Sequence, residues 1–195
     1  MKNIVFLFFF SINVLSCKTE RTGNPHIEIQ TKQGNIELEL FPKQAPKTVA
    51  AFLSYIDSGY FFNANFYRVL NLQNQPINAP KTELIQGGIW KSNNELATHL
   101  PGIPHESTEQ TGIHHTDGVI SLARSAPGTA GAEFFICIGD QRGLDVGGEN
   151  MADKLGFAAF GKVVKGMNVV MKISQENESD QYFRPPVPIY NIVRK

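Results

Sequence analysis

The sequence has few cysteines and no excess charge of either sign. It contains two cysteines in 195 residues, its formal net charge at pH 7 is zero, and no block of basic residues occurs. Nucleic-acid binding depends on lysines and arginines that neutralise phosphates, so a nucleic acid is not an expected partner. No internal repeat is visible, which argues against a solenoid or a propeller.

The sequence also lacks a compact metal-binding pattern. His99, His105, His114 and His115 lie within residues 91–117, a stretch without clear periodicity. Their spacings match no zinc motif, and no cysteine accompanies them. We therefore predict histidines that lie on the surface or pack within the loop, with no metal and no cofactor.

Glycine and proline are plentiful. The 17 glycines, 11 prolines and 42% hydrophobic residues suit a turn-rich β protein. A chain of this length can form one domain with its own core, and no change in composition divides it.

Short runs of alternating apolar and polar residues predict strands. Residues 26–31 and 35–41 are expected to form a hairpin, with Ile36, Leu38 and Leu40 on one face. Further strands are predicted at residues 65–70, 84–90, 118–123, 132–138, 157–164 and 189–194.

Two helices are predicted from apolar residues at helical spacing. The first begins near Pro46, carries Val49, Phe52 and Ile56 on one face, and ends at Gly59. The second covers Met167–Ser174. We expect each helix to cover one open end of a barrel.

The N-terminal residues have the character of an export signal. Lys2 precedes the apolar run Ile4–Leu15, which is too short to span a bilayer as a mature helix. Val14–Cys17 (Val-Leu-Ser-Cys) is similar to a bacterial lipobox, in which the bond before the cysteine is cleaved and the Cys17 thiol carries a diacylglyceryl group. A plain secretory signal is the alternative.

The lipobox divides the chain into three parts. Residues 1–16 are predicted to be a lipoprotein signal peptide, residues 17–25 the lipidated cysteine and its tether, and residues 26–195 the folded domain. Lipidation of Cys17 would leave Cys137 without a partner, so we expect no intrachain disulfide and a core position for Cys137.

Three predicted strands carry a polar side chain among apolar neighbours: Phe66–Val69 (Phe-Tyr-Arg-Val), Leu84–Gly88 (Leu-Ile-Gln-Gly-Gly) and Glu133–Ile136 (Glu-Phe-Phe-Ile). On a regular strand Arg68 would share a face with Phe66. An unpaired buried charge is costly, so Arg68 either reaches water at a strand edge or has a function.

Together these segments resemble a cyclophilin, a peptidyl-prolyl cis-trans isomerase. The likeness runs from about Ile27 to the C-terminus, and it is closest to the shorter, exported bacterial members. Further matches are Gly34–Leu40, Ala45-Pro46, Gly118–Arg124 and Phe160–Met167. The resemblance implies a mostly β fold: a closed eight-stranded antiparallel β-barrel capped by two α-helices.

The resemblance also implies the site residues. Arg68 and Gln86 would be catalytic, with Arg68 donating a hydrogen bond to the prolyl nitrogen. The substrate-binding positions would be Tyr67, Leu84, Ala123, Arg124, Glu133, Phe135, Leu144 and Phe157.

This chain departs from the family pattern at several positions. Tyr67 replaces a histidine, Glu133 replaces a glutamine, and Glu83 aligns with a pocket phenylalanine across about ten extra residues in Leu72–Thr82. We expect the two carboxylates either to orient Arg68 or to occupy its donors, and to favour substrates with Lys or Arg near the proline. The extra loop is either functional or passively tolerated.

The leading interpretation is an isomerase that acts on Xaa-Pro bonds of exported proteins. It would be a monomer, bound through its lipid to a membrane of the bacterial envelope and facing the periplasm or exterior. Its partners would be proline-containing peptides and unfolded polypeptides. The main alternative is a proline-peptide-binding or chaperone module with weakened catalysis. A hydrolase using Ser121 or Ser125 lacks a nucleophile elbow.

Overall fold

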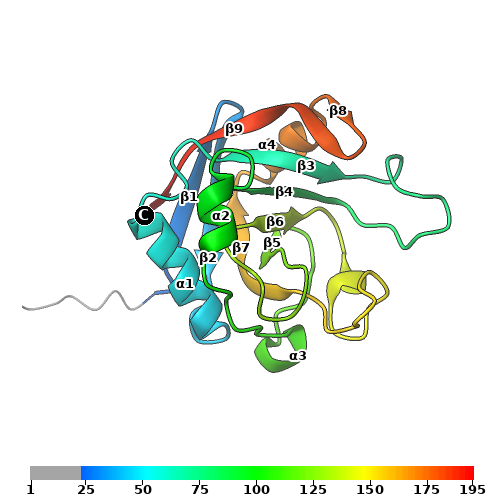
Figure 1. Ribbon diagram of the computed structural model, residues 1–195, viewed down its shortest axis with the longest axis horizontal. Helices are drawn as coiled ribbons and strands as arrows, with labels where there is room; N and C mark the ends of the chain where they lie inside the picture. The colour runs from blue at the N-terminus through cyan, green and yellow to red at the C-terminus, as the bar shows by residue number, and fades with distance from the viewer. Residues whose placement is uncertain (1–22) are drawn as a thin grey trace, which may run out of the picture.

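Figure 1 presents a computed structural model of the chain, which describes residues 23–195. The predicted signal peptide, Cys17 and most of the tether lie outside the described residues. The strands are β1 (His26–Thr31), β2 (Gly34–Leu40), β3 (Asn65–Leu70), β4 (Leu84–Gly88), β5 (Val119–Leu122), β6 (Phe134–Cys137), β7 (Ala158–Lys165), β8 (Glu178–Ser179) and β9 (Tyr182–Arg194). The helices are α1 (Pro46–Asp57), α2 (Asn94–His99), α3 (Thr108–Thr111) and α4 (Met167–Ser174), with a 3₁₀ turn at Arg142–Leu144.

The strands form a closed antiparallel barrel. Eight of them follow the order β1-β2-β7-β5-β6-β4-β3-β9, and β1 also pairs with β9, so the sheet returns to its starting point. The two-residue strand β8 is added beside β9. Closure removes the long unpaired edges at which a sheet could aggregate, and it confirms the expected fold.

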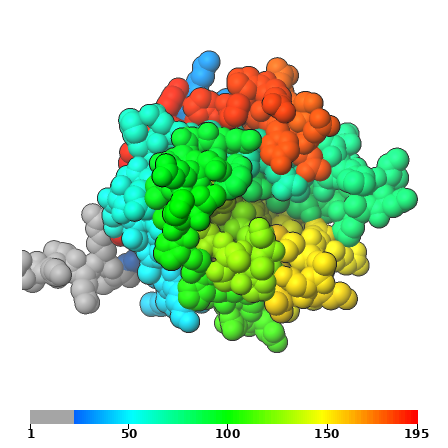
Figure 2. Space-filling view, viewed as in Figure 1, coloured from blue at the N-terminus to red at the C-terminus, as the bar shows by residue number. Residues whose placement is uncertain are grey.

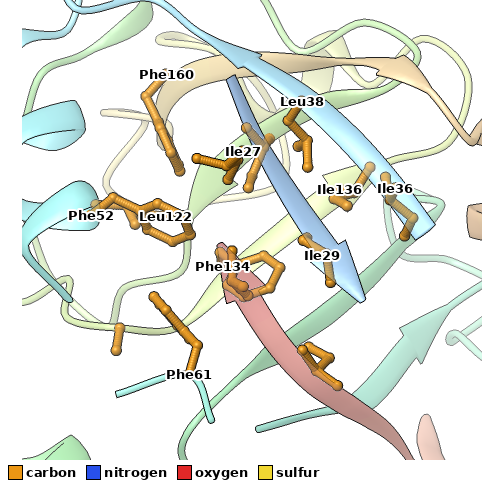
Figure 3. Close-up of a cluster of buried hydrophobic side chains, with 14 of the residues drawn as sticks. Ile27, Ile29, Ile36, Leu38, Phe52, Phe61, Leu122, Phe134, Ile136 and Phe160 are labelled. Carbon is orange, nitrogen blue, oxygen red and sulfur yellow. The ribbon is translucent and has the colours of Figure 1, made fainter. Parts of the chain in front are cut away.

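Phenylalanines fill one end of the barrel beneath α1. Phe134 makes edge-to-face contacts with Phe52 of α1, Phe61 and Phe66, with ring centroids 5.7–6.0 Å apart. Figure 3 shows Phe52, Phe61 and Phe134 in one cluster with aliphatic side chains of β1, β2 and β6. Such aromatic pairs contribute beyond the area that they bury, so this cluster anchors α1 to the barrel.

Strand β6 is buried on both faces. Phe134 and Ile136 point into the barrel, whereas Phe135 and Cys137 belong to a separate outer cluster with Leu84. Burial raises the pKa of the Cys137 thiol, which suits a packing role. One short strand therefore builds the core and the floor of an external pocket at once.

The structure corrects two expectations about the elements. Strand β9 begins at Tyr182 rather than at residue 189, because the proline-bearing residues before position 189 already pair with β3 and β8. The stretch 91–117 contains the short helices α2 and α3. Their starts are fixed by capping side chains, Asn93 for α2 and Ser107 with Gln110 for α3, and not by apolar periodicity.

Among the helices of residues 23–195, none has the length and apolar character that crossing a membrane requires.

Candidate active site

A β-bulge in β3 sets the direction of Arg68. Phe66 lies opposite Gly87 of β4 and Arg68 lies opposite Gln86, so Tyr67 is the extra residue. The prediction that Arg68 shares a face with Phe66 is therefore wrong. Phe66 stays in the core, while Tyr67 and Arg68 both turn outward and line a cavity. A bulge re-aims side chains in this way because two residues oppose one on the partner strand.

Two neighbouring cavities, of about 430 and 370 Å³, lie on the outer face of this part of the barrel. Arg68, Gln86, Ala123 and Arg124 line both of them, so these residues form the boundary between the two. Figure 2 shows the smaller cavity as a hollow between α2, residues 125–131 and the start of β9. Each site residue predicted within the domain lines at least one cavity: Tyr67, Arg68, Leu84, Gln86, Ala123, Arg124, Glu133, Phe135, Leu144 and Phe157.

The larger cavity has an apolar floor. Leu84, Phe135 and Leu144 are each at least 95% buried and form one cluster, against which Phe157 packs. The rings of Phe135 and Phe157 meet edge to face at 5.2 Å between centroids. A rigid apolar pocket of this kind suits a small aliphatic ring.

The extra loop forms one wall of the larger cavity. Among the residues that line it are Gln75, Ala79, Pro80 and Thr82 of the loop and residues 149–151. The amide of Asn150 donates to the Thr82 hydroxyl and joins the two segments. The loop, which is teal in Figure 2, and the yellow segment that includes residues 149–151 lie side by side.

Arg68 is held by neutral amides. Its Nη2 donates to Gln181 Oε1 at 2.7 Å and its Nη1 to Gln86 Oε1 at 3.4 Å, while Gln86 Nε2 donates to the Tyr67 hydroxyl at 2.7 Å. Arg68 Nε is buried without a hydrogen-bond partner. Within residues 23–195, Arg68 is found in no ion pair with a carboxylate, so no neighbouring negative charge offsets the guanidinium at the cavity.

Among the described residues, neither Glu83 nor Glu133 forms an ion pair or a hydrogen bond with Arg68, so neither occupies its donors. Glu133 Oε1 accepts the backbone N–H groups of Ile89 and Trp90 at 2.8 and 2.9 Å. Burial raises the pKa of Glu133, although hydrogen bonds from Tyr67 and these two amides oppose the rise. Glu83 lines neither cavity. Glu133 lines the smaller cavity, so the preference for substrates with Lys or Arg near the proline stays a prediction.

The side chain of Arg124 supports the pocket from behind. It is almost fully buried, forms two hydrogen bonds with the Asp153 carboxylate, and lies over the Phe157 ring at 5.3 Å. Hydrogen bonds from Arg124 lower the pKa of Asp153 to about 2. Only the backbone of Arg124 thus remains a candidate for substrate contact, as the resemblance implies.

A buried polar network lies behind Phe135. His115 Nδ1 is 2.7 Å from Asp145 Oδ1, and His115 Nε2 is 3.0 Å from the Ser121 hydroxyl. The ionised Asp145 carboxylate can only accept, so Nδ1 carries a proton and donates it to Asp145, while Nε2 lies within hydrogen-bond distance of the Ser121 hydroxyl. His115 and Ser121 have no exposed surface, so no substrate reaches this serine and it cannot serve as the nucleophile of a hydrolase.

Sequence reasoning missed this network and also Gln181. His115 contacts a partner 30 residues away, and Gln181 contacts Arg68 across 113 residues. The periodicity of a single chain carries no signal for such pairs. His115 is nevertheless a packed loop histidine, as predicted, and its ring stacks on Phe135 with centroids 5.9 Å apart. No three potential ligands gather into a metal-binding group within residues 23–195.

Comparisons of sequence agree with this geometry. Residues 26–194 match the family model described as cyclophilin type peptidyl-prolyl cis-trans isomerase/CLD. Peptidyl-prolyl cis-trans isomerase A of Dickeya dadantii is 34% identical over 183 residues, covering 92% of this chain and 88% of that protein. Peptidyl-prolyl cis-trans isomerase B of Escherichia coli is 33% identical over 148 residues, covering 75% and 82%.

Solved structures show the same fold. A cyclophilin-type peptidyl-prolyl cis-trans isomerase from Cryptosporidium parvum superimposes with a TM-score of 0.68, at 21% identity, over 88% of this chain and 98% of that one. A second structure of that protein, in the presence of the dipeptide Ala-Pro, gives a TM-score of 0.66 at 22% identity, over 87% and 98%.

Proposed function

This chain belongs to the cyclophilin-type peptidyl-prolyl cis-trans isomerases, and from that premise we propose that it isomerises Xaa-Pro bonds of exported proteins at a membrane of the bacterial envelope. The apolar N-terminal run and the lipobox-like Val14–Cys17 support the location. Acyl chains on Cys17 would hold the enzyme durably, since each buried CH₂ contributes about 0.8 kcal/mol. The enzyme would act as a monomer on proline-containing peptides and unfolded polypeptides.

The reaction needs neither a covalent intermediate nor a proton transfer. Rotation about the amide before proline loses the conjugation between nitrogen and carbonyl, with a barrier of about 18–20 kcal/mol, and takes tens of seconds or longer without help. A catalyst must bind the twisted amide better than either planar form. It can do so with a donor at the nitrogen, whose lone pair becomes available as conjugation is lost.

The observation that carries the assignment of roles is that Arg68 lines the same cavity as the apolar floor of Leu84, Phe135 and Leu144. A proline ring on that floor brings its nitrogen toward a guanidinium that no carboxylate neutralises. Arg68 then donates to the nitrogen in the twisted state. Gln86, on the neighbouring strand, orients Arg68 and can hold the adjacent peptide backbone.

An isomerisation assay on residues 18–195 tests the catalytic part. We expect catalysis of a Xaa-Pro peptide by the unaltered domain and a loss of about 100-fold or more in Arg68→Ala, equivalent to about 3 kcal/mol of transition-state stabilisation. Arg194→Ala, which removes an exposed arginine paired with Asp57, is the matched control and should retain activity. Peptide binding without rate enhancement would instead support the binding-module alternative.

Expression of the full chain in a bacterium tests the location. With radiolabelled palmitate, we expect label on the unaltered protein in the membrane fraction and none on Cys17→Ser. An unlabelled protein that is cleaved and recovered in the soluble fraction would replace the lipid anchor with a plain secretory signal.

A further inference from the structure

The turn between β8 and β9 has an unusual residue in a strained position. Ser179 pairs with Tyr182, so Asp180 and Gln181 form a two-residue loop. Their φ angles are +53° and +73°, which places both in the left-handed region. Tight hairpins of this kind favour Asn, Asp or Gly at these positions, because a side chain crowds the backbone there. Glutamine at position 181 is a costly choice for the turn itself.

The side chain of Gln181 explains that choice. Its Oε1 accepts from Arg68 Nη2 at 2.7 Å, which is shorter than the 3.4 Å contact between Arg68 Nη1 and Gln86 Oε1. Its Nε2 donates to the carbonyl of Asn74 in the extra loop at 3.2 Å. Gln181 therefore makes the shorter of the two hydrogen bonds to the guanidinium, and its own side chain is held by the extra loop.

The backbone of Gln181 is fixed as well. Its carbonyl accepts the N–H of Val69, the residue after Arg68, at 2.8 Å, and its own N–H donates to Glu178 Oε2 at 2.9 Å. The turn is thus hydrogen-bonded to β3 at the residue that follows Arg68. Strain that persists at one residue near an active site, while its surroundings hold it in place, is a recognised sign of a functional constraint.

We propose that Gln181 is a positioning residue that fixes the Arg68 guanidinium for the isomerase reaction. An amide oxygen is suited to this task because it restrains the cation without cancelling its charge. A long side chain that is held in advance loses less conformational freedom when the twisted amide forms, so the hold lowers the barrier. This inference rests on the role proposed for Arg68.

The variant Gln181→Gly separates positioning from a structural role, because it should lower kcat without lowering the melting temperature. Glycine adopts the left-handed conformation freely, so the melting temperature should stay the same or rise. We expect kcat to fall about 10-fold, with little change in KM, when both are measured by NMR exchange on a Xaa-Pro peptide. Full kcat in Gln181→Gly, or a loss that only follows a lower melting temperature, overturns the proposal.

Asp180→Gly is the matched control. Asp180 lies in the same turn, also with a positive φ angle, and among the described residues no hydrogen bond or ion pair joins its exposed side chain to Arg68. It should retain kcat. An equal loss of kcat in Asp180→Gly would attribute the effect to hairpin flexibility and overturn the proposal.

A double-mutant comparison isolates the pathway through Arg68. In an Arg68→Ala background, Gln181→Gly should cause no further loss, because the group that it positions is gone. If Gln181→Gly lowers kcat in the Arg68→Ala background as much as it does in the unaltered domain, the inference is contradicted. If Arg68→Ala alone keeps its activity, the proposed catalytic role fails first. If Arg68→Ala is inactive and Gln181→Gly is not, only the role of Gln181 fails.

Discussion

Two polar networks lie on opposite sides of Phe135, and they are built differently. The inner network, Ser121–His115–Asp145, is buried, and hydrogen bonds join both nitrogens of the His115 ring to the other two side chains. The outer network holds Arg68 between neutral amides and leaves Arg68 Nε without a partner. An unpaired buried donor costs about 1–3 kcal/mol, so its persistence needs a reason.

The difference between the two networks separates stability from function. The inner network uses an ionised carboxylate whose hydrogen bonds are satisfied, and it supports the back of Phe135. The outer network keeps a charged donor that is incompletely satisfied beside an open cavity. We therefore expect changes behind Phe135 to lower stability and changes in front of it to lower activity.

The largest expected effect is on stability, from His115→Ala. The change leaves the Asp145 carboxylate partly unpaired and opens a cavity behind Phe135, so the free energy of unfolding should fall by about 2–4 kcal/mol. Urea denaturation measures it. His99→Ala, at an exposed position in α2, is the matched control and should change stability by less than about 0.5 kcal/mol. A small effect in His115→Ala would remove the distinction between the networks.

Arg68→Lys sharpens the comparison from the other side, since it keeps the charge but removes the planar fork that reaches two amides. We expect kcat/KM to fall about 30-fold, or about 2 kcal/mol, with the melting temperature within about 2 °C of the unaltered domain. Full activity in Arg68→Lys would mean that positive charge alone suffices and that the amide contacts are dispensable.

Acid titration tests the inner network through protonation of the Asp145 carboxylate. Burial raises the pKa of Asp145, but hydrogen bonds from His115 and His114 outweigh it and lower that pKa to about 2, against 3.8 for a free aspartate. A lowered pKa stabilises the fold above about pH 4, and this contribution is lost as the pH falls toward 2. The stability difference between the unaltered protein and Asp145→Asn should therefore shrink by about 1–2 kcal/mol over that interval. Parallel pH profiles of unfolding would contradict this assignment.

The smallest expected effect concerns the extra loop. Leu70 pairs with Leu84, so an Asn-Gly turn can replace residues 71–83 and close a two-residue hairpin. The loop lines the larger cavity, so its removal should weaken binding of longer proline peptides about 5-fold, or about 1 kcal/mol, measured by calorimetry. Ile77→Ser, at a loop position that is 92% exposed and lines neither cavity, is the control. Equal affinity without the loop would show that the loop does not contribute to peptide binding.

Much of the fold could be predicted because, along most of the chain, the residues with strand or helix periodicity are also those that the tertiary structure places in strands and helices. The predicted strand at 65–70 and helix at 167–174 coincide with β3 and α4. The closed barrel was implied by the family resemblance and is confirmed by the pairing of β1 with β9. The predicted site residues also gather around two adjacent cavities, although their catalytic roles stay predictions until the variants are assayed.

The sequence by itself determined where the strands and helices run and which residue types would meet at the groove, because apolar periodicity and short motifs are local properties of a chain. Only the tertiary structure decided the bulge at Tyr67 that turns Arg68 outward, the hydrogen bonds of Glu133 to backbone N–H groups, and the hydrogen bond between Gln181 and Arg68. Those outcomes depend on register between strands and on contacts across long sequence separations, which no pattern along one strand encodes.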